Sequence, residues 1–489
     1  MKIIRLPYSD NITTIFNTIA SYPWTIWLDS GQAKAFNQRY DIISGFPYKT
    51  YLSDLEKTSI EYVKYRTRKN SLISTVIKKE TINHKDNNTN PFDLINNDLK
   101  RINTNLKNNI FDESIPFWHG ALGYFAYDLN QLLYSQLQTN VDSSSIPLCA
   151  MGIYAWALII DHEQEKISLA YDPKFISNKI IKTILYLLSS NSTENVVTEN
   201  PKLLLALTDF FKNNQFASPV SPETYNQNFK AIKDHIKNGN CYQINYALPF
   251  ELSLNNITSI NSWHVYQYFK QFNKNLFGCY FNIQDKLQVL SFSPERFIQL
   301  RDQQISAEPI KGTRKNLATD PLINKKIKDE LKKSQKDRAE NIMIVDLMRN
   351  DLNKVCIPGT VQAKQVCILR SFPTVHHLIS TITGTLSNQY SAVDLLKSSF
   401  PGGSITGTPK LRAMQVIQEL ENKDGHLTRY VYCGSIGYIN INQNMDMSIA
   451  IRTIVNDDNT CKYWAGSGIV ADSENNAEYN EIFTKLLKQ

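Results

Sequence analysis

Hydrophobic and polar residues alternate along this chain with two different periods. A period of two, or a short run of apolar residues buried on both faces, predicts strands. By these criteria we expect strands at residues 24–28, 40–44, 150–162, 242–252, 278–283, 286–291, 299–306 and 447–455. An apolar residue at every third or fourth position predicts helices at residues 201–211, 222–239, 325–350, 409–421 and 474–487. The mixture predicts a protein of the α/β (α+β) class.

Two polar segments interrupt these patterns. Residues 67–106 are rich in Asn, Lys and Thr and are expected to form an exposed insertion or a helix with a large solvated face. Ser, Asn, Thr and Pro dominate around residues 191–220, which we expect to be a linker. The predicted organisation is therefore an N-terminal region at residues 1–190 and a catalytic domain at residues 221–487.

Composition excludes several classes of protein. The 489 residues can bury a large core, and the net charge of +7 is a small excess that does not imply nucleic acid but is compatible with a small anionic substrate. Seven scattered cysteines without a C-x-x-C pair predict no disulfide framework or zinc site, which fits a reducing cytoplasm. We find no signal-peptide pattern and no apolar run long enough to span a membrane.

The most informative single residue is a lysine in the segment AEPIKGTR. Lys311 lies between Pro309 and Gly312, where an extended segment is expected to turn back and where backbone can approach a ligand closely. A lysine amine becomes a nucleophile when burial or a neighbouring cation, here Arg314, leaves part of it uncharged. The alternative is a solvated lysine in a turn, which is the commoner situation.

Carboxylates recur in register on two of the predicted helices. Asp337 and Glu340 lie three residues apart on one helix, and Glu474, Glu478 and Glu481 align on the last one. Magnesium takes one or two protein carboxylates and fills its other positions with water and substrate oxygens, so the two helices could share one cation. The alternative is a pair of ordinary solvated acidic faces.

Three further segments carry groups suited to small anions. Residues 400–410 form a glycine-rich loop before a helix, with Thr408 as the expected N-cap and without Walker A spacing. Arg452 projects from its predicted strand among small side chains, which suits capture of a carboxylate. Tyr438 and the backbone of the turn at residues 465–468 are expected beside it. The structural alternatives are a hairpin turn at residues 465–468 and an arginine on an edge strand.

Glu295 stands beside Arg296 in the segment SPERF, a pair that by itself would be an ordinary surface ion pair. SPERF is one of a series of segments between residues 222 and 485, namely CYQIN, SPERF, PIKGT, KDRAENIMIVDLMRND, VHHL, FPGGSITGTPKLRAM, CGSIGY, IRT and AEYNE. In the identity and order of these segments the chain resembles the chorismate-utilising enzymes, and within them the aminodeoxychorismate synthases. The resemblance implies an anthranilate synthase component I-like fold, with two α/β halves around a layered antiparallel β-sheet sandwich.

The resemblance also implies roles for individual residues. Lys311 would attack ring carbon C2 of chorismate while the C4 hydroxyl leaves, Glu295 would be the acid that assists its departure, and His377 would lie close to the ring. Ammonia would then enter at C4 to give 4-amino-4-deoxychorismate, on the route to 4-aminobenzoate and folate. Magnesium would be held by Glu340 and Glu481, with Asp337 and Glu478 near or in its coordination shell. The substrate would be positioned by Gln243, Thr313, Thr406, Tyr438, Arg452, Gly466, Ser467 and Gly468.

The resemblance leaves alternatives and implies a partner. An anthranilate synthase component, which carries alanine at the position of Lys311, is the alternative activity, and a non-catalytic sensor of chorismate or tryptophan is the alternative class. No segment resembles a glutaminase, so a separate glutamine amidotransferase subunit is expected to deliver ammonia. Ser30 resembles the serine of a tryptophan pocket in relatives, but residues 273–277 depart from the stretch that precedes the next strand there, so tryptophan binding is a hypothesis only.

Overall fold

The structure is a computed structural model of the whole chain. It describes residues 1–31, 39–104, 112, 115–137, 146–189, 196–255, 260–273, 276–317, 320–372, 375–423 and 428–487. Parts of the predicted linker and of the segment 273–277 lie outside the described residues.

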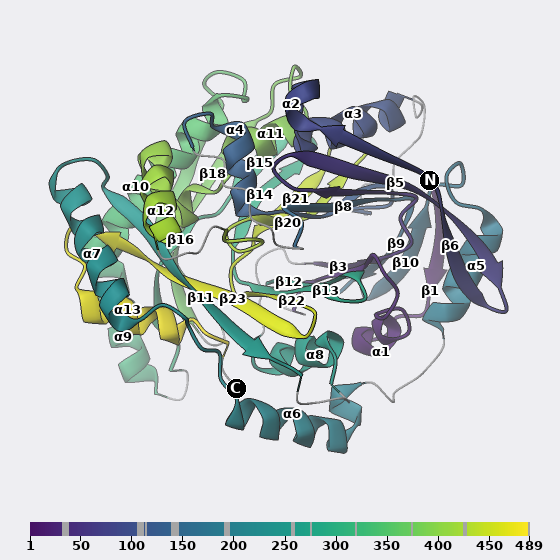
Figure 1. Cartoon of the computed structure of the whole chain (residues 1–489), viewed down its shortest axis with the longest axis horizontal. Coiled ribbons are helices and arrows are strands. Elements are labelled where there is room, and N and C mark those ends of the chain that lie inside the picture. Colours follow the sequence, from purple (N-terminus) through teal and green to yellow (C-terminus); the bar gives the residue numbers. More distant parts are fainter. Residues whose placement is uncertain are drawn as a thin grey trace.

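Two large antiparallel sheets form the centre of the molecule (Figure 1). The first has eleven strands, in the spatial order β1 (Lys2–Leu6), β10 (Lys166–Tyr171), β9 (Trp156–Asp161), β3 (Tyr40–Ser44), β2 (Thr25–Asp29), β12 (Phe277–Gln284), β13 (Leu287–Ser293), β22 (Thr453–Asp457), β23 (Thr460–Val470), β11 (Gln243–Ser253) and β19 (Gly407–Thr408).

The second sheet has twelve strands, one of which pairs off the main path. Its order is β16 (Ile310–Lys315), β18 (Val375–Thr385), β15 (Gln304–Ala307), β14 (Arg296–Arg301), β21 (Met445–Ile449), β20 (Ser435–Asn440), β7 (Gly120–Phe125), β8 (Cys149–Tyr154), β4 (Lys49–Ser53), β5 (Lys57–Arg68) and β6 (Ser71–Asn83), with β17 (Gln362–Ser371) paired to β18.

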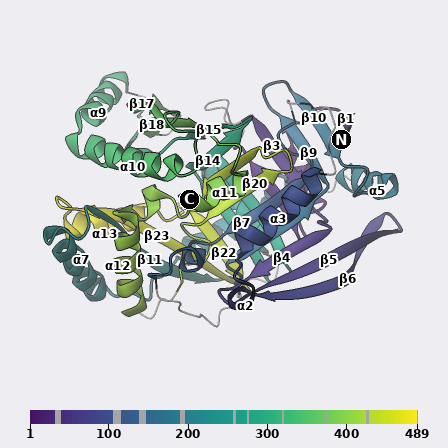
Figure 2. The same cartoon turned by 90° about the horizontal axis from the view of Figure 1, so that it is seen from above.

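Helices cover the outer faces and the ends of the sheets (Figures 1 and 2). They are α1 (Ile12–Asn17), α2 (His84–Asn87), α3 (Pro91–Thr104), α4 (Asn130–Leu133), α5 (Asn178–Leu188), α6 (Pro201–Asn213), α7 (Pro222–Lys237), α8 (Ser262–Phe272), α9 (Pro321–Lys333), α10 (Gln335–Asn353), α11 (Ala392–Ser399), α12 (Lys410–Lys423) and α13 (Asn475–Thr484), with short 3-10 turns η1 (Tyr127–Leu129), η2 (Val197–Glu199) and η3 (Gly403–Ile405). Among the described helices, none combines the length and apolar character needed to cross a membrane.

The main hydrophobic core lies between the two sheets. Phe281 and Val289 of the first sheet and Phe125 and Met447 of the second belong to this one buried cluster. A second cluster packs helices such as α7 and α8 against the first sheet. The layered antiparallel architecture that the resemblance implied is therefore confirmed.

Strands from both sides of the predicted linker pair with each other. In the first sheet β2 pairs with β12, and in the second β7 pairs with β20. The N-terminal region and the catalytic region thus share both sheets, and the boundary at residues 191–220 stays a prediction from composition.

Two predicted strands each turn out to be two strands that belong to different sheets, and the single strand expected at 299–306 is wrong because it is the β14–β15 hairpin. The chain passes from β8 to β9 at Ala155, from β13 to β14 at residues 294–295, and from β21 to β22 at residues 450–452. The expected single strands at 150–162 and 447–455 are therefore wrong. Side chains on both faces are buried on either side of each crossing, so the apolar pattern continues without a break.

Three other local expectations are also corrected. The helix expected at 325–350 is two helices, because Ser334 ends α9 and its hydroxyl caps the start of α10. The described part of the polar segment, residues 67–104, forms the end of β5, then β6, α2 and α3, so neither an insertion without strands nor a single helix is found. The Lys311 segment does not turn back: β15 and β16 run one after the other along β18, with a break at residues 308–309 and a bulge at Gly312.

Candidate active site

Two of the sheet crossings lie side by side and bring Glu295 and Arg452 to one pocket. The backbone N–H of Ile449 donates to the carbonyl of Glu295 over 3.1 Å, and the N–H of Phe292 donates to the carbonyl of Arg452 over 3.0 Å. Arg452 adopts a left-handed conformation with φ 52°, which turns it out of the strand direction. Both side chains line a cavity of about 510 Å³.

Lys311 enters this cavity from β16. Its Nζ donates to the backbone carbonyl of Ser404 over 3.2 Å, and the bulge at Gly312 sits against α9 and α10. Burial raises the pKa of the Glu295 carboxyl, although the positive charge of Lys311 opposes the shift. A buried carboxyl with a raised pKa is suited to donating a proton next to a lysine amine.

His377 and Thr313 stand on neighbouring strands at the same cavity. Thr313 Oγ1 and His377 Nδ1 share a hydrogen bond of 2.7 Å. Burial, followed by the nearby charge of Arg452, lowers the pKa of His377 to about 4. The imidazole is therefore neutral near pH 7 and can serve as a hydrogen-bonding group but not as a cation.

Arg314 does not act as a bare cation beside Lys311, contrary to the sequence-based expectation. Its Nη2 lies 3.1 Å from Asp337 Oδ2 and its Nε 3.4 Å from Glu330 Oε1. Asp337 thus lines the cavity as the ion-pair partner of Arg314.

Helices α10 and α13 both contribute predicted acids to the lining of the cavity. Glu478 accepts a hydrogen bond of 2.6 Å from Ser473 and has Lys336 of α10 at 3.6 Å. Glu481 is paired with Lys485 at 2.7 Å. Each of these acids therefore faces a lysine of the same cavity.

Glu340 completes the set of acids. Burial raises the pKa of its carboxyl, with the charges of Lys311 and Lys336 opposing the shift. Among the described residues, no group of three or more His, Cys, Asp or Glu side chains is arranged to hold a metal ion. Glu340 and Glu481 nevertheless line one cavity from different helices, and two carboxylates fit the coordination that magnesium takes when substrate and water supply the remaining oxygens.

The turn expected at residues 465–468 is wrong, because these residues lie within β23 and pair with β11. This part of the strand contributes its backbone to the cavity. Gly466 and Gly468 line it, whereas the Ser467 hydroxyl does not and lies on the opposite face of the strand. Thr406 is also absent from the lining, because its hydroxyl donates within its own loop to the carbonyls of Gly402 and Gly403. Ser404 and Ile405 of that loop line the cavity in its place.

Gln243 lies directly behind the wall of the cavity. It is fully buried, and neither the oxygen nor the nitrogen of its carboxamide has a hydrogen-bond partner among the described residues. A Cβ added at Gly468 would stand 2.6 Å from Gln243 Nε2, so this glycine is needed for the close approach.

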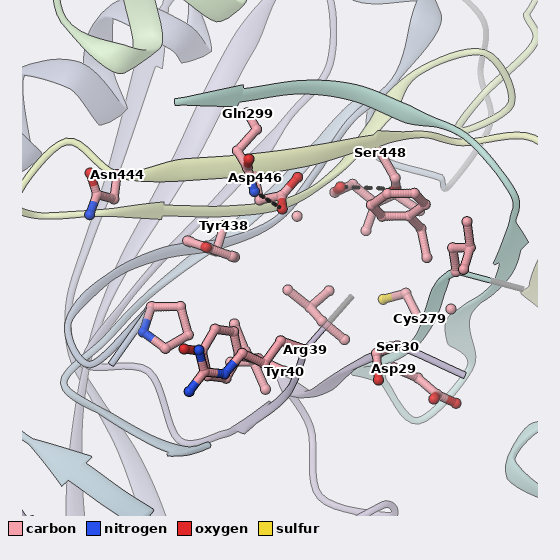
Figure 3. Close-up of a pocket in the computed structure, with 18 of the residues that line it drawn as sticks. Asp29, Ser30, Arg39, Tyr40, Cys279, Gln299, Tyr438, Asn444, Asp446 and Ser448 are labelled. Carbon is pink, nitrogen blue, oxygen red and sulfur yellow. Dashed lines mark hydrogen bonds between the residues drawn. The ribbon is translucent and has the colours of Figure 1, made fainter. Parts of the chain in front are cut away.

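Tyr438 is not part of this cavity. It lines a second pocket of about 420 Å³ together with Ser30, Cys279 and Asp446 (Figure 3). Tyr432, at the other end of the same YCGSIGY segment, lines the first cavity instead. The alternation of side chains along β20 could not predict the place of Tyr432, because this residue precedes the strand.

Sequence reasoning missed several other residues of the first cavity. Asn245, Lys336, Tyr432 and Lys485 all line it. Asn245 could have been found, because it lies two residues after Gln243 and so shares its face of β11. Lys485 could have been found as the residue one helical turn after Glu481.

Comparisons with known proteins agree with this architecture. A family model described as chorismate binding enzyme matches residues 56–488. Aminodeoxychorismate synthase component 1 of Klebsiella aerogenes is 37% identical over 487 residues, covering 99% of this chain and 97% of that protein. The protein of the same name from Escherichia coli is 36% identical, covering 97% and 95%. Anthranilate synthase component 1 of Aquifex aeolicus is 34% identical, covering 76% and 74%.

Solved structures show the same fold. Anthranilate synthase component I from Streptococcus pneumoniae superimposes with a TM-score of 0.67 at 24% identity, covering 93% of this chain and 92% of that one. The fold and the cavity define a chorismate-utilising type of enzyme, and the resemblance seen in the sequence is confirmed. The chain belongs to the chorismate-binding enzyme family.

Proposed function

We propose that this chain is the synthase component that converts chorismate and ammonia to 4-amino-4-deoxychorismate. The observation that carries the proposal is the lysine at position 311, whose amine enters the same cavity as the buried Glu295 carboxyl and the acids of α10 and α13. The relatives that cover nearly the whole chain carry the name aminodeoxychorismate synthase component 1, which supports this activity.

In the proposed mechanism Lys311 is the nucleophile. Its uncharged amine forms a bond to C2 of chorismate, the two ring double bonds each shift by one position, and the C4–oxygen bond breaks. Glu295 gives its proton to the leaving oxygen, which departs as water. Ammonia then bonds to C4, the double bonds shift back, and the bond between C2 and Lys311 breaks. The enolpyruvyl group stays on the ring.

The other side chains hold the substrate in place. Arg452 suits one carboxylate through a bidentate contact, and the backbone N–H groups around Gly466 and Gly468 suit a second. Magnesium, held by Glu340 and Glu481, would neutralise the charge of a substrate carboxylate. Neutral His377, anchored by Thr313, would lie near the ring as a hydrogen-bonding group.

A separate glutamine amidotransferase subunit is the proposed source of ammonia. The name component 1 of the relatives implies a partner subunit in those proteins, which supports this proposal. An anthranilate synthase activity is the second candidate, because relatives with that name also match three quarters of the chain.

Product analysis tests the proposal. The protein is incubated with chorismate, Mg²⁺ and ammonium, and 4-amino-4-deoxychorismate is expected. Lys311→Ala should abolish most of its formation, whereas Lys315→Ala, at the exposed end of the same strand, should not. Anthranilate and pyruvate as the products would establish the second candidate, and binding of chorismate without any turnover would show a sensor.

A further inference from the structure

An ion pair is buried directly behind the wall of the candidate active site. Arg429, which precedes β20, donates from Nε to Glu421 Oε2 over 2.9 Å and from Nη2 to Glu421 Oε1 over 2.6 Å. Their side chains are only 1% and 8% exposed. Neither residue lines the cavity.

The same guanidinium holds the strand that forms the wall. Arg429 Nη2 also donates to the backbone carbonyl of Asn245 on β11 over 2.8 Å. The guanidinium carbon lies 5.9 Å from the centre of the ring of Tyr432, which lines the cavity. Arg429 is thus linked to two residues of the wall without reaching the cavity itself.

Asn245 passes this constraint on to the loop that precedes α12. Its backbone N–H donates to the carbonyl of Thr406 over 2.8 Å, and its Nδ2 donates to the carbonyl of Ile405 over 3.1 Å. The neighbouring carbonyl, that of Ser404, accepts the hydrogen bond from Lys311 Nζ. The hydroxyl of Ser404 interacts in addition with the Glu295 carboxyl.

A continuous series of polar contacts therefore connects a buried ion pair to the reactive groups. We propose that Arg429, held by Glu421, is a positioning residue that fixes Lys311 and Glu295 through Asn245 and the loop at residues 403–406. The inference rests on the proposed function of Lys311. A buried ion pair is weak evidence for stability, because desolvation offsets much of its attraction, so we assign this pair a role in fixing geometry.

Steady-state kinetics with chorismate, Mg²⁺ and ammonium tests this proposal. Glu421→Gln keeps the shape of the side chain but removes the charge that orients Arg429. Because a displacement of about 1 Å at reacting groups costs up to about 100-fold in rate, we expect kcat to fall by about 10- to 100-fold. The KM for chorismate should stay within about twofold, since Arg452, which is proposed to bind one of its carboxylates, makes none of the hydrogen bonds of this series.

Asn245→Ala provides a second, uncharged perturbation that leaves the ion pair intact. It removes the amide that holds Ile405, and we expect the same pattern of reduced kcat. Combined with Glu421→Gln it should add little, because both changes break one series of contacts. If Glu421→Gln does not fold, Asn245→Ala decides alone, and an unchanged kcat in this variant overturns the proposal.

Asp98→Asn is the matched control. Asp98 is a buried acid paired with Lys49, and neither residue lines the cavity, so its replacement should lower stability while leaving kcat unchanged. Equal losses of kcat in Asp98→Asn and Glu421→Gln, or additive effects of Glu421→Gln and Asn245→Ala, would overturn the proposal. A wild-type protein without turnover would instead contradict the proposed function.

Discussion

Replacement of Gly312 tests whether the bulge beside Lys311 is set by close packing against two helices. Gly312 has φ 80°, in the left-handed region. A Cβ built there would lie 2.9 Å from Asp337 Cβ and 3.1 Å from Leu331 Cδ1. Leu331 is the only buried residue of α9, so a methyl group at this position pushes that helix away from β16 at its anchoring point.

The chain offers a control with the same backbone conformation. Gly359 also has φ 80°, but a Cβ there meets nothing within 4 Å. Gly359→Ala should therefore cost only the left-handed strain of about 1–2 kcal/mol. Gly312→Ala should cost about 1–3 kcal/mol more, because the added methyl overpacks the contact with Asp337 and Leu331.

Urea unfolding at pH 7 measures both costs, and initial rates with chorismate measure the effect on the site. We expect Gly312→Ala to lower kcat by about tenfold or more, because Lys311 is the adjacent residue and its amine would be displaced. Gly359→Ala should leave kcat unchanged. Equal losses of stability in the two variants, with normal kinetics in both, would refute the packing argument for Gly312.

Three further predictions concern single side chains. Tyr432→Phe should raise the KM for chorismate several-fold in the same rate assay, whereas Tyr438→Phe should not; the reverse result would show that the cavity is assigned wrongly. The pKa of His377 in the folded protein is about 4, below its unfolded value of 6.5. The contribution of the neutral imidazole to the free energy of unfolding is therefore fully present above pH 6.5 and is lost as the pH falls towards 4. Urea unfolding should show the wild type losing up to about 3 kcal/mol more than His377→Gln across this range; equal losses would show that His377 takes up a proton freely in the folded protein. If the second pocket binds tryptophan, native mass spectrometry should show one bound molecule, weakened by Ser30→Ala, and no adduct at all would remove that hypothesis.

The sequence located many elements correctly, because their patterns have local causes. Residues 40–44 form β3 as expected, and Ser221 caps α7 by accepting from the N–H of Thr224. The sequence analysis did not predict that α9 ends and α10 begins at Ser334, although the residues there are typical of a helix start. A serine followed three residues later by Asp337 is typical of a helix start, but no glycine or proline marked the end of α9.

The sheet crossings could not be predicted from periodicity. At Ala155 the chain leaves one sheet for the other, and the residues before and after it are buried on both faces. A continuous apolar run is compatible with one long central strand or with two strands in stacked sheets. Only pairing with distant strands distinguishes them, as in the pairing of β8 with β4 and of β9 with β3.

The same crossings explain why the sequence motifs located Glu295 and Arg452 at the site, whereas the alternation of hydrophobic and polar residues did not. A residue at a crossing leaves the ladder of its strand, so its side chain is free to point into the space where the two sheets separate. Glu295 and Arg452 occupy two such crossings, and hydrogen bonds between their flanking backbones hold the two side by side. Their separation in the sequence is large, yet the fold brings them to one cavity. Tyr438 does not lie at a crossing. It is paired within β20 and lines the second pocket instead of the candidate active site. The positions of Glu295 and Arg452 are therefore set by where strands change sheets, whereas a side chain within a regular strand must be assigned from the structure.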